Sequence, residues 1–386
     1  MTKQAEERRY PRKELDAMME QIFDGEVHAQ RLASLCDGVD GVLHAAQLGI
    51  RAIGRGLAAA NGLCPKSAIK QVDRLLSKAN TLSKQTFALW LRFVLASRQQ
   101  ITVNFDWTEF PDSDHSMLFL GMQTEHGRST PLLWKTFPTS TLCEQRNEHE
   151  DELLLLLSEL LPKEISVLVV ADRGFADTKL FSFLSQELRM DYIIRIKKNF
   201  TVTSEKGEQR SANDWLAASG RMKVLKRPKL TAQEVEVGQF VCVQEEGMKQ
   251  AWFLASSRQD LKGSEVKKLY GKRFTVEETF RDLKNPRYGL GLKEVNIRKP
   301  QRRDALTWLA VLAHTLLTLL GKAGREAGME KYLGATRQGE LSLFRMGLML
   351  FDLIPRMEQR RLHTLLLHFE TLLLGHSSLS ELLGVL

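Results

Sequence analysis

Hydrophobic and polar residues follow a helical period at the start of the chain. An apolar, alanine-rich run over about 40–60 predicts one helix, and a second begins at Pro65, a residue that suits the first turn of a helix. The basic residues Lys70 and Arg74 lie on one side of this second helix, and its other side is an apolar stripe of Ile69, Val72, Leu75 and Leu76. Residues 1–100 are therefore predicted to form a helical domain with a basic face, the alternative being an ordinary solvated helix.

A strand period replaces the helical one at residue 101. Ile101, Val103, Phe105 and Trp107 share one face, and the polar face opposite holds Thr102, Asn104, Asp106 and Thr108. Two more strands are predicted, followed by a helix, an apolar strand, a second helix and a last strand, at about 116–123, 130–137, 143–161, 165–171, 177–189 and 191–196. This order predicts an α/β core whose ligands gather at the carboxyl ends of the strands.

The pattern is interrupted over 197–258, which is basic and rich in β-forming residues and therefore predicts an inserted β subdomain. Helical periods return at about 261–285, 303–321, 341–353 and 359–374. We divide the chain into a helical N-terminal domain, the first part of the core, the insertion, the second part of the core and a helical C-terminal region that is a candidate for dimerisation, with the bounds 1–100, 101–196, 197–258, 259–321 and 322–386.

Composition excludes several classes of protein. A hydrophobic content of 43% over 386 residues rules out global disorder. The N-terminus has no apolar signal region, and the longest nearly uncharged apolar stretch, 306–320, is shorter than the ~20 residues of a membrane span. The four cysteines are too far apart for a zinc ladder, so we expect reduced thiols in a cytoplasmic protein.

Charge is divided unevenly along the chain. The formal net charge is +8, but residues 101–194 carry −9 and residues 195–303 carry +12. A cationic segment beside an anionic one predicts that a polyanion binds the first and a divalent cation the second. The alternative is the ordinary fluctuation of charge along a chain.

The most specific local feature is the segment 270–284. On a helix, Tyr270, Arg273, Glu277, Arg281 and Lys284 occupy roughly 80° of arc beside an apolar strip. One carboxylate would then lie among three cations, and this surplus of positive charge predicts a phosphate-rich ligand passing over Glu277. The alternative is a salt-bridged surface helix, which contributes little.

Two further carboxylates complete a candidate metal site. Asp106 lies on the polar face of the first strand, and Asp172 follows the buried strand 165–171. Hard divalent cations bind oxygen ligands, and two such ions can serve an in-line displacement at phosphorus. Asp106, Asp172 and Glu277 are therefore the predicted metal ligands, although the chain offers other acidic residues nearby.

These residues resemble a known family. Tyr270, Arg273, Glu277 and Lys284 match the Y-(2)-R-(3)-E-(6)-K signature of the bacterial insertion-sequence-four family of DDE cut-and-paste transposases. The segments 276–284 and 288–292 look like the branch of the tetracycline-resistance composite transposon, and Phe105-Asp-Trp-Thr and Ala171-Asp-Arg-Gly-Phe resemble the family's Asp blocks. The resemblance covers about 65–310, and Phe274 stands where many relatives carry Trp.

The resemblance implies a ribonuclease H-like catalytic core interrupted by a β-rich insertion. It implies that Asp106, Asp172 and Glu277 are catalytic ligands of Mg²⁺, for which Mn²⁺ can substitute. DNA contacts are implied for Tyr270, Arg273 and Lys284, and we add Arg281, Lys70 and Arg74 from their positions on basic faces. In related enzymes an insertion-domain Trp stacks on a flipped base, and Trp252 lies in the matching segment, with a core Trp as the alternative.

The predicted function is therefore transposition of DNA. The enzyme would bind the inverted-repeat ends of its element as a homodimer in a synaptic complex, excise the element through a hairpin and join its 3′ ends to target DNA, with no membrane involved. Two alternatives stay open: an inactive, domesticated transposase that only binds DNA, and a ribonuclease H-like nuclease that only hydrolyses. Metal-dependent nicking and strand-transfer products distinguish the three.

Overall fold

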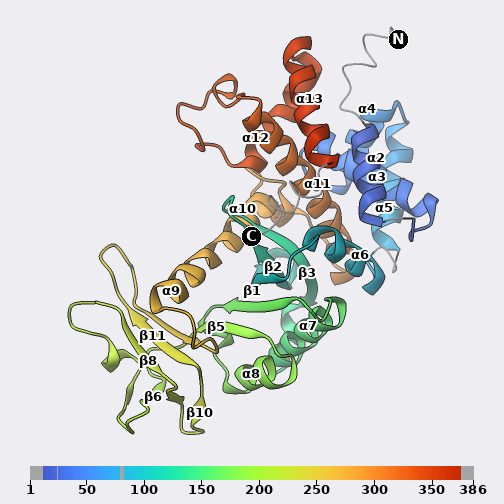
Figure 1. Cartoon of the computed structure of the whole chain (residues 1–386). Helices are drawn as coiled ribbons and strands as arrows, with labels where there is room; N and C mark the ends of the chain where they lie inside the picture. Colours follow the sequence, from blue (N-terminus) through green and yellow to red (C-terminus); the bar gives the residue numbers. More distant parts are fainter. Residues whose placement is uncertain (1–11, 24, 79–81, 375–386) are drawn as a thin grey trace.

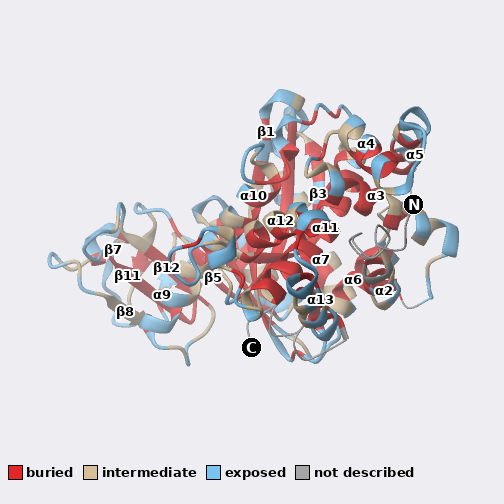
Figure 2. Ribbon diagram, turned by 90° about the horizontal axis from the view of Figure 1, so that it is seen from above, coloured by how far each residue is buried: buried red, intermediate tan, exposed pale blue. Residues whose placement is uncertain are grey.

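The structure, a computed structural model, describes residues 12–23, 25–78 and 82–374 (Figure 1). The outermost parts of the predicted N-terminal and C-terminal regions, 1–11 and 375–386, lie outside the described residues. Helices gather at both chain ends, a mixed sheet occupies the middle, and a β-rich lobe extends to one side (Figure 1). Buried residues run continuously from the helical part into the sheet (Figure 2).

The N-terminal region is helical, as predicted, but its first predicted helix is two helices. The region contains α2 (Arg12–Phe23), α3 (Ala29–Ala45), α4 (Ile50–Asn61), α5 (Pro65–Ser77) and α6 (Lys84–Leu95). A single helix over 40–60 is wrong because Ala46 ends α3 in the left-handed conformation, with φ of 49°. The two helices then pack closely where they cross, since a Cβ on Gly56 would meet the Gly41 carbonyl oxygen at 2.5 Å.

An eight-stranded mixed sheet forms the core. Its strands, in spatial order, are β3 (Ser129–Pro138), β2 (His115–Gln123), β1 (Gln100–Phe110), β4 (Ser166–Ala171), β5 (Asp191–Arg195), β12 (Trp252–Ser256), β11 (Gln239–Val243) and β8 (Lys223–Lys226). The strands predicted between 101 and 196 all form. β1, β4 and β5 pair in parallel and the other neighbours are antiparallel. The helices between these strands are α7 (Arg146–Leu160) and the short α8 (Thr178–Ser182), which continues as a π-helical turn.

The β-rich interruption is only partly a separate sheet. β8, β11 and β12 extend the core sheet, and a second sheet contains β10 (Val235–Glu236), β9 (Lys229–Leu230), β6 (Thr201–Thr203) and β7 (Gln209–Ser211). The hydrogen bonds between β12 and β5 therefore make the lobe continuous with the core. Where one domain ends and the next begins stays a prediction.

Five helices follow the sheet, namely α9 (Gly263–Gly271), α10 (Thr275–Lys284), α11 (Pro300–Glu326), α12 (Leu343–Leu353) and α13 (Gln359–Leu374). The apolar stretch 306–320, which from the sequence is too short for a membrane span, belongs to the longer helix α11. By length and composition alone, α11 could cross a membrane. However, 94% of its most apolar window is buried within the protein, as in a core helix. Trp308 on α11 packs edge-on against Trp90 of α6 at 5.4 Å and lies 5.8 Å from Trp134 of β3, so N-terminal helices, sheet and C-terminal helices share one core.

Candidate active site

The two predicted aspartates lie on neighbouring parallel strands. β1 and β4 pair in parallel with Phe105 opposite Ala171, so Asp106 and Asp172, each one residue further on, come at the same carboxyl edge of the sheet. Asp172 accepts a hydrogen bond from the backbone N–H of Arg173 at 2.7 Å, which fixes its side chain at the strand end. The sheet thus brings together two carboxylates that are 66 positions apart in the chain.

Glu277 reaches this edge from α10. The sequence predicted a continuous helix through 270–284, but residues Lys272–Phe274 form a 3₁₀ turn between α9 and α10. Tyr270 at the end of α9 and Arg273 in this turn are both buried, so the polar arc predicted beside the apolar strip is itself partly enclosed. Glu277 itself is about half exposed.

Buried hydrogen bonds attach the start of α10 to the sheet. Asn104 of β1 donates to Thr275 on α10 at 3.1 Å and to Ser129 of β3 at 2.7 Å. The Ser129 backbone N–H donates in turn to Thr279 at 2.8 Å. Asn104 was predicted on a polar face, and this face is polar because it receives α10 rather than water. The network holds Glu277 in place relative to Asp106.

Arg273 bridges two of the three carboxylates. Its guanidinium donates to Asp106 at 3.0 Å and to Glu277 at 2.8 Å, and its side chain is only 6% exposed. Burial raises the pKa of Asp106 to about 6; the positive charge of Arg273 opposes this rise, and the negative charges of Asp172 and Glu277 add to it. The three carboxylates are therefore close enough to repel one another, and a cation placed among them is stabilised.

Three aromatic side chains, Tyr270, Trp252 and Phe274, pack together beside Asp172. The Tyr270 hydroxyl donates to Asp172 at 3.3 Å, and burial, with a contribution from the charge of Asp172, raises the pKa of Tyr270 to about 12. Trp252 of β12 packs edge-on against Tyr270 at 4.9 Å and stacks at 6.3 Å on Phe274, which is 44% exposed. Trp252 is partly buried, so it is neither a fully buried core residue nor a freely exposed one.

The last turn of α10 carries Arg281 and Lys284, the other two cations of the predicted polar arc. Lys284 donates to the Thr108 hydroxyl at 3.0 Å and the Glu109 carbonyl at 2.7 Å. Burial lowers the pKa of Lys284 to about 8, and the nearby positive charges of Lys293 and Arg303 add to the effect. Arg281 is exposed and pairs with Glu278 at 2.8 Å. The structure thus places Lys284 beside the end of β1 and directs Arg281 to solvent.

Lys70 and Arg74 are exposed on α5, as predicted for a basic face. α5 packs against α3, α4 and α11, and it lies apart from α10, the helix that carries Glu277 (Figure 1). The two sets of predicted DNA contacts therefore lie on separate parts of the molecule.

One functional candidate and one buried charge cluster were missed. Arg195 at the end of β5 approaches Asp172 to 4.0 Å, and its place at the carboxyl end of a parallel strand could have indicated it. Asp282 on α10 accepts from Arg128 at 2.6 Å and lies 3.3 Å from His314 of α11. No sequence pattern connects Asp282, Arg128 and His314, because they meet only through tertiary packing.

The oxygen donors fit a hard divalent cation in chemistry. Asp106, Asp172 and Glu277 supply only carboxylate oxygens, and their mutual repulsion favours a positive charge between them. Nevertheless, within residues 12–23, 25–78 and 82–374 no group of three or more His, Cys, Asp or Glu side chains is arranged to hold a metal ion. Arg273 holds Asp106 and Glu277 in this arrangement, so the metal-ligand assignment stays a prediction.

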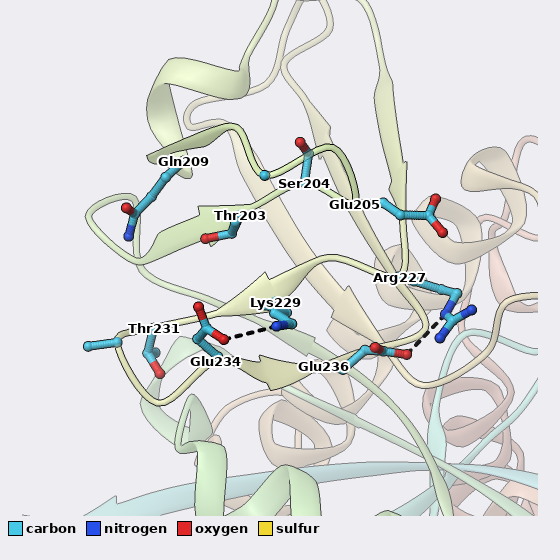
Figure 3. Close-up of a pocket in the computed structure, with 11 residues that line it drawn as sticks. Thr203, Ser204, Glu205, Gln209, Arg227, Lys229, Thr231, Glu234 and Glu236 are labelled. Carbon is cyan, nitrogen blue, oxygen red and sulfur yellow. Dashed lines mark hydrogen bonds and ion pairs between the residues drawn. The ribbon is translucent and has the colours of Figure 1, made fainter.

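A hollow of about 570 Å³ in the insertion is a different kind of surface (Figure 3). Its two cations are already neutralised, since Lys229 pairs with Glu234 at 2.9 Å and Arg227 pairs with Glu236 at 3.0 Å. Glu205 adds a further negative charge to its wall (Figure 3). This hollow is poorly suited to a phosphate chain and contains none of the predicted site residues.

A comparison with known protein families identifies a transposase domain in this chain. The transposase DDE domain family matches residues 124–316, half of the chain, a range that includes Asp172 and Glu277 and begins after Asp106. No curated protein matches the chain. With its mixed sheet, its helix-borne glutamate and this match, the chain belongs to the transposase DDE domain family.

Proposed function

We propose that this protein is a DNA transposase of the insertion-sequence-four family, in the branch of the tetracycline-resistance composite transposon. It binds the inverted-repeat ends of its element, excises the element and joins the 3′ ends to target DNA. The observation that carries the proposal is the meeting of Asp106, Asp172 and Glu277 at one sheet edge, beside the complete four-residue signature.

Each residue has a separate role in this proposal. Asp106, Asp172 and Glu277 hold Mg²⁺ or Mn²⁺, which when bound supplies a Lewis acid and lowers the pKa of an attacking water. Arg273, whose guanidinium donates to Asp106 and Glu277, contacts the DNA backbone near the cut end. Lys284 and Tyr270 position the DNA backbone, and Trp252 stacks on an extruded base.

One site is sufficient for the complete reaction. Nicking, hairpin formation, hairpin opening and target joining are all in-line phosphoryl transfers that differ only in the attacking oxygen, either water or a DNA 3′-hydroxyl. The protein must therefore hold successive phosphates in one geometry rather than form a covalent intermediate. Two ends are processed together, so we propose a homodimer in a synaptic complex, with Lys70 and Arg74 contacting DNA away from the carboxylates.

The test is cleavage of a labelled element end, taken from inverted repeats that flank the coding region. Asp106→Asn and Glu277→Gln should bind this DNA with the affinity of the unaltered protein and nick it at least about a thousandfold more slowly. Glu278→Gln is the matched control, because the neighbouring carboxylate pairs with Arg281 instead of Arg273. Full nicking by Asp106→Asn or Glu277→Gln would contradict the assignment.

The same assay separates the alternatives. DNA binding by the unaltered protein without nicking at any metal concentration would favour the domesticated DNA-binding protein. Nicking without joined products would favour the nuclease. Sedimentation of the protein with paired element ends tests the dimer, because a synaptic complex contains two protein chains and two DNA ends.

A further inference from the structure

An exposed tyrosine, Tyr288, lies in the loop that follows α10, the helix that carries Glu277. Tyr288 is 50% exposed in the loop after α10. The Asn285 side chain accepts hydrogen bonds from the backbone N–H groups of Arg287 at 2.8 Å and Tyr288 at 2.9 Å. The next residue, Gly289, lies so close to α10 that a Cβ there would meet the Asp282 carbonyl oxygen at 2.1 Å. The loop backbone is therefore held against α10, and it presents a half-exposed aromatic ring to solvent.

Two guanidinium groups from different elements approach this ring. Arg287 of the loop lies 5.1 Å from its centroid, and Arg345 on α12 lies 6.0 Å from it. Among the described residues, neither guanidinium has a carboxylate within ion-pair distance. A half-exposed ring flanked by two positive charges that have no carboxylate partner offers both a stacking face and a binding site for an anion.

The chain contains a second tyrosine that shows the ordinary version of this arrangement. Tyr332 is 39% exposed, and Arg361 lies 4.6 Å from its ring. There, however, Glu358 pairs with Arg361 at 3.8 Å and neutralises it. The difference between the two tyrosines is thus the free positive charge, which Tyr288 has and Tyr332 lacks.

We propose that Tyr288, Arg287 and Arg345 form a binding site for an unpaired nucleotide of DNA, a role that rests on the proposed transposase function. The ring offers a face on which a base stacks, and the guanidinium groups bind the adjoining phosphates. The base must be unpaired because both faces of a base inside a duplex are already stacked. Gly289, next to Tyr288, lies against Asp282, which is about 8 Å along α10 from Glu277, so the site adjoins the helix that carries Glu277 and would hold a strand separated there.

The experiment measures binding to single-stranded and double-stranded DNA without cleavage. The probes are an oligothymidylate of about twenty nucleotides and a duplex of the same length, titrated by fluorescence anisotropy with the full chain in the absence of divalent cations. Tyr288→Ala should weaken binding of the oligothymidylate about 5- to 100-fold and change duplex binding less than twofold. Tyr288→Phe should bind as the unaltered protein does, because stacking needs the ring and not the hydroxyl.

Charge and ring are tested separately. Arg287→Gln and Arg345→Gln should each reduce the salt dependence of oligothymidylate binding by about 0.7 in the slope of log K against log salt. Tyr332→Ala is the matched control and should leave both affinities unchanged. Equal loss on both probes, an equal effect of Tyr332→Ala, or loss with Tyr288→Phe would overturn the inference.

The nucleotide site and the transposase function are tested by different assays, namely single-strand binding and nicking of element ends. If the unaltered protein nicks element ends but Tyr288→Ala binds single strands normally, the transposase proposal stands and the nucleotide site is wrong. If the unaltered protein does not bind the oligothymidylate, the nucleotide site is wrong, and nicking of element ends still decides the transposase proposal.

Discussion

Replacing Arg273 with glutamine tests whether one cation holds the candidate catalytic carboxylates together. Its guanidinium donates to Asp106 at 3.0 Å and to Glu277 at 2.8 Å. Glutamine keeps a polar side chain, although a shorter one, and removes the positive charge. Asp106, whose side chain is 19% exposed, would then lie near two other carboxylates with no cation in contact.

The magnitude follows from the exposure of each pair. Removing one partner of a buried ion pair costs about 3–5 kcal/mol, whereas an exposed pair contributes about 0.2–1 kcal/mol. The pair with Asp106 is mostly buried, and the pair with Glu277, which is 51% exposed, is close to a surface pair. We expect the free energy of unfolding to fall by about 2–4 kcal/mol, or about 3–5 °C in Tm for a single transition in a chain of this length.

The pH dependence separates the electrostatic loss from a packing loss. The pKa of Asp106 is raised from 3.8 to about 6, so the folded protein binds this proton more tightly than the unfolded chain does. Its contribution to stability is therefore greatest below pH about 4 and decreases as the pH rises to about 6. Without Arg273 the pKa of Asp106 rises further, so the decrease in Tm should continue above pH 6 in the variant.

Scanning calorimetry at several pH values measures both effects. Arg281→Gln is the control, because Arg281 lies on the same helix but is exposed and pairs with Glu278, and its effect should stay within about 0.5 kcal/mol. Added Mg²⁺ should raise the Tm of Arg273→Gln more than that of the unaltered protein. Equal Tm losses in Arg273→Gln and Arg281→Gln at every pH would show that Arg273 does not hold the carboxylates together.

Three further predictions concern the helices around the site. Asp282→Asn removes the charge of the buried partner of Arg128 and should lower the free energy of unfolding, measured in urea titrations, by about 3–5 kcal/mol. A loss of only about 0.2–1 kcal/mol, as for an exposed ion pair, would contradict this prediction. The pKa of Lys284 is about 8, so the salt dependence of DNA binding should decrease by about one phosphate contact between pH 7 and pH 9, and Lys284→Met should abolish this change. Gly347→Ala places a Cβ 1.7 Å from the Leu317 carbonyl oxygen where α12 crosses α11, and should lower the Tm measured by circular dichroism; an unchanged Tm would contradict this close packing.

Local pattern was sufficient for most elements of the core. The alternation in β1, the apolar run in β4 and the proline at the start of α5 each reflect a period or a backbone restriction that acts within a few residues. The break at Ala46 was missed because an alanine carries no sequence signal for the left-handed conformation that it adopts there. The 3₁₀ turn at Lys272–Phe274 was missed for a similar reason, since none of its residues forbids a continuous helix.

The candidate site divides in the same way. Asp172 could be placed from the sequence because it directly follows a buried strand, and Asp106 because it lies on the polar face of an alternating strand. The contact of Arg195 with Asp172 and the pairing of Arg128 with Asp282 could not, since each joins elements whose relative position depends on packing across the whole chain. The free guanidinium groups beside Tyr288 belong to the same class, because Arg345 reaches the ring from a distant helix.

By itself the sequence determined which residues are available for chemistry: the three carboxylates, the four-residue signature and the basic faces. The tertiary structure decided which of these residues meet and in which environment. Arg273, predicted on a polar arc beside an apolar strip, is buried and donates to Asp106 and Glu277. The physical reason is that spacing along a chain fixes only short-range geometry, whereas burial and the distances between charges, which set pKa values and ion-pair strengths, depend on long-range packing.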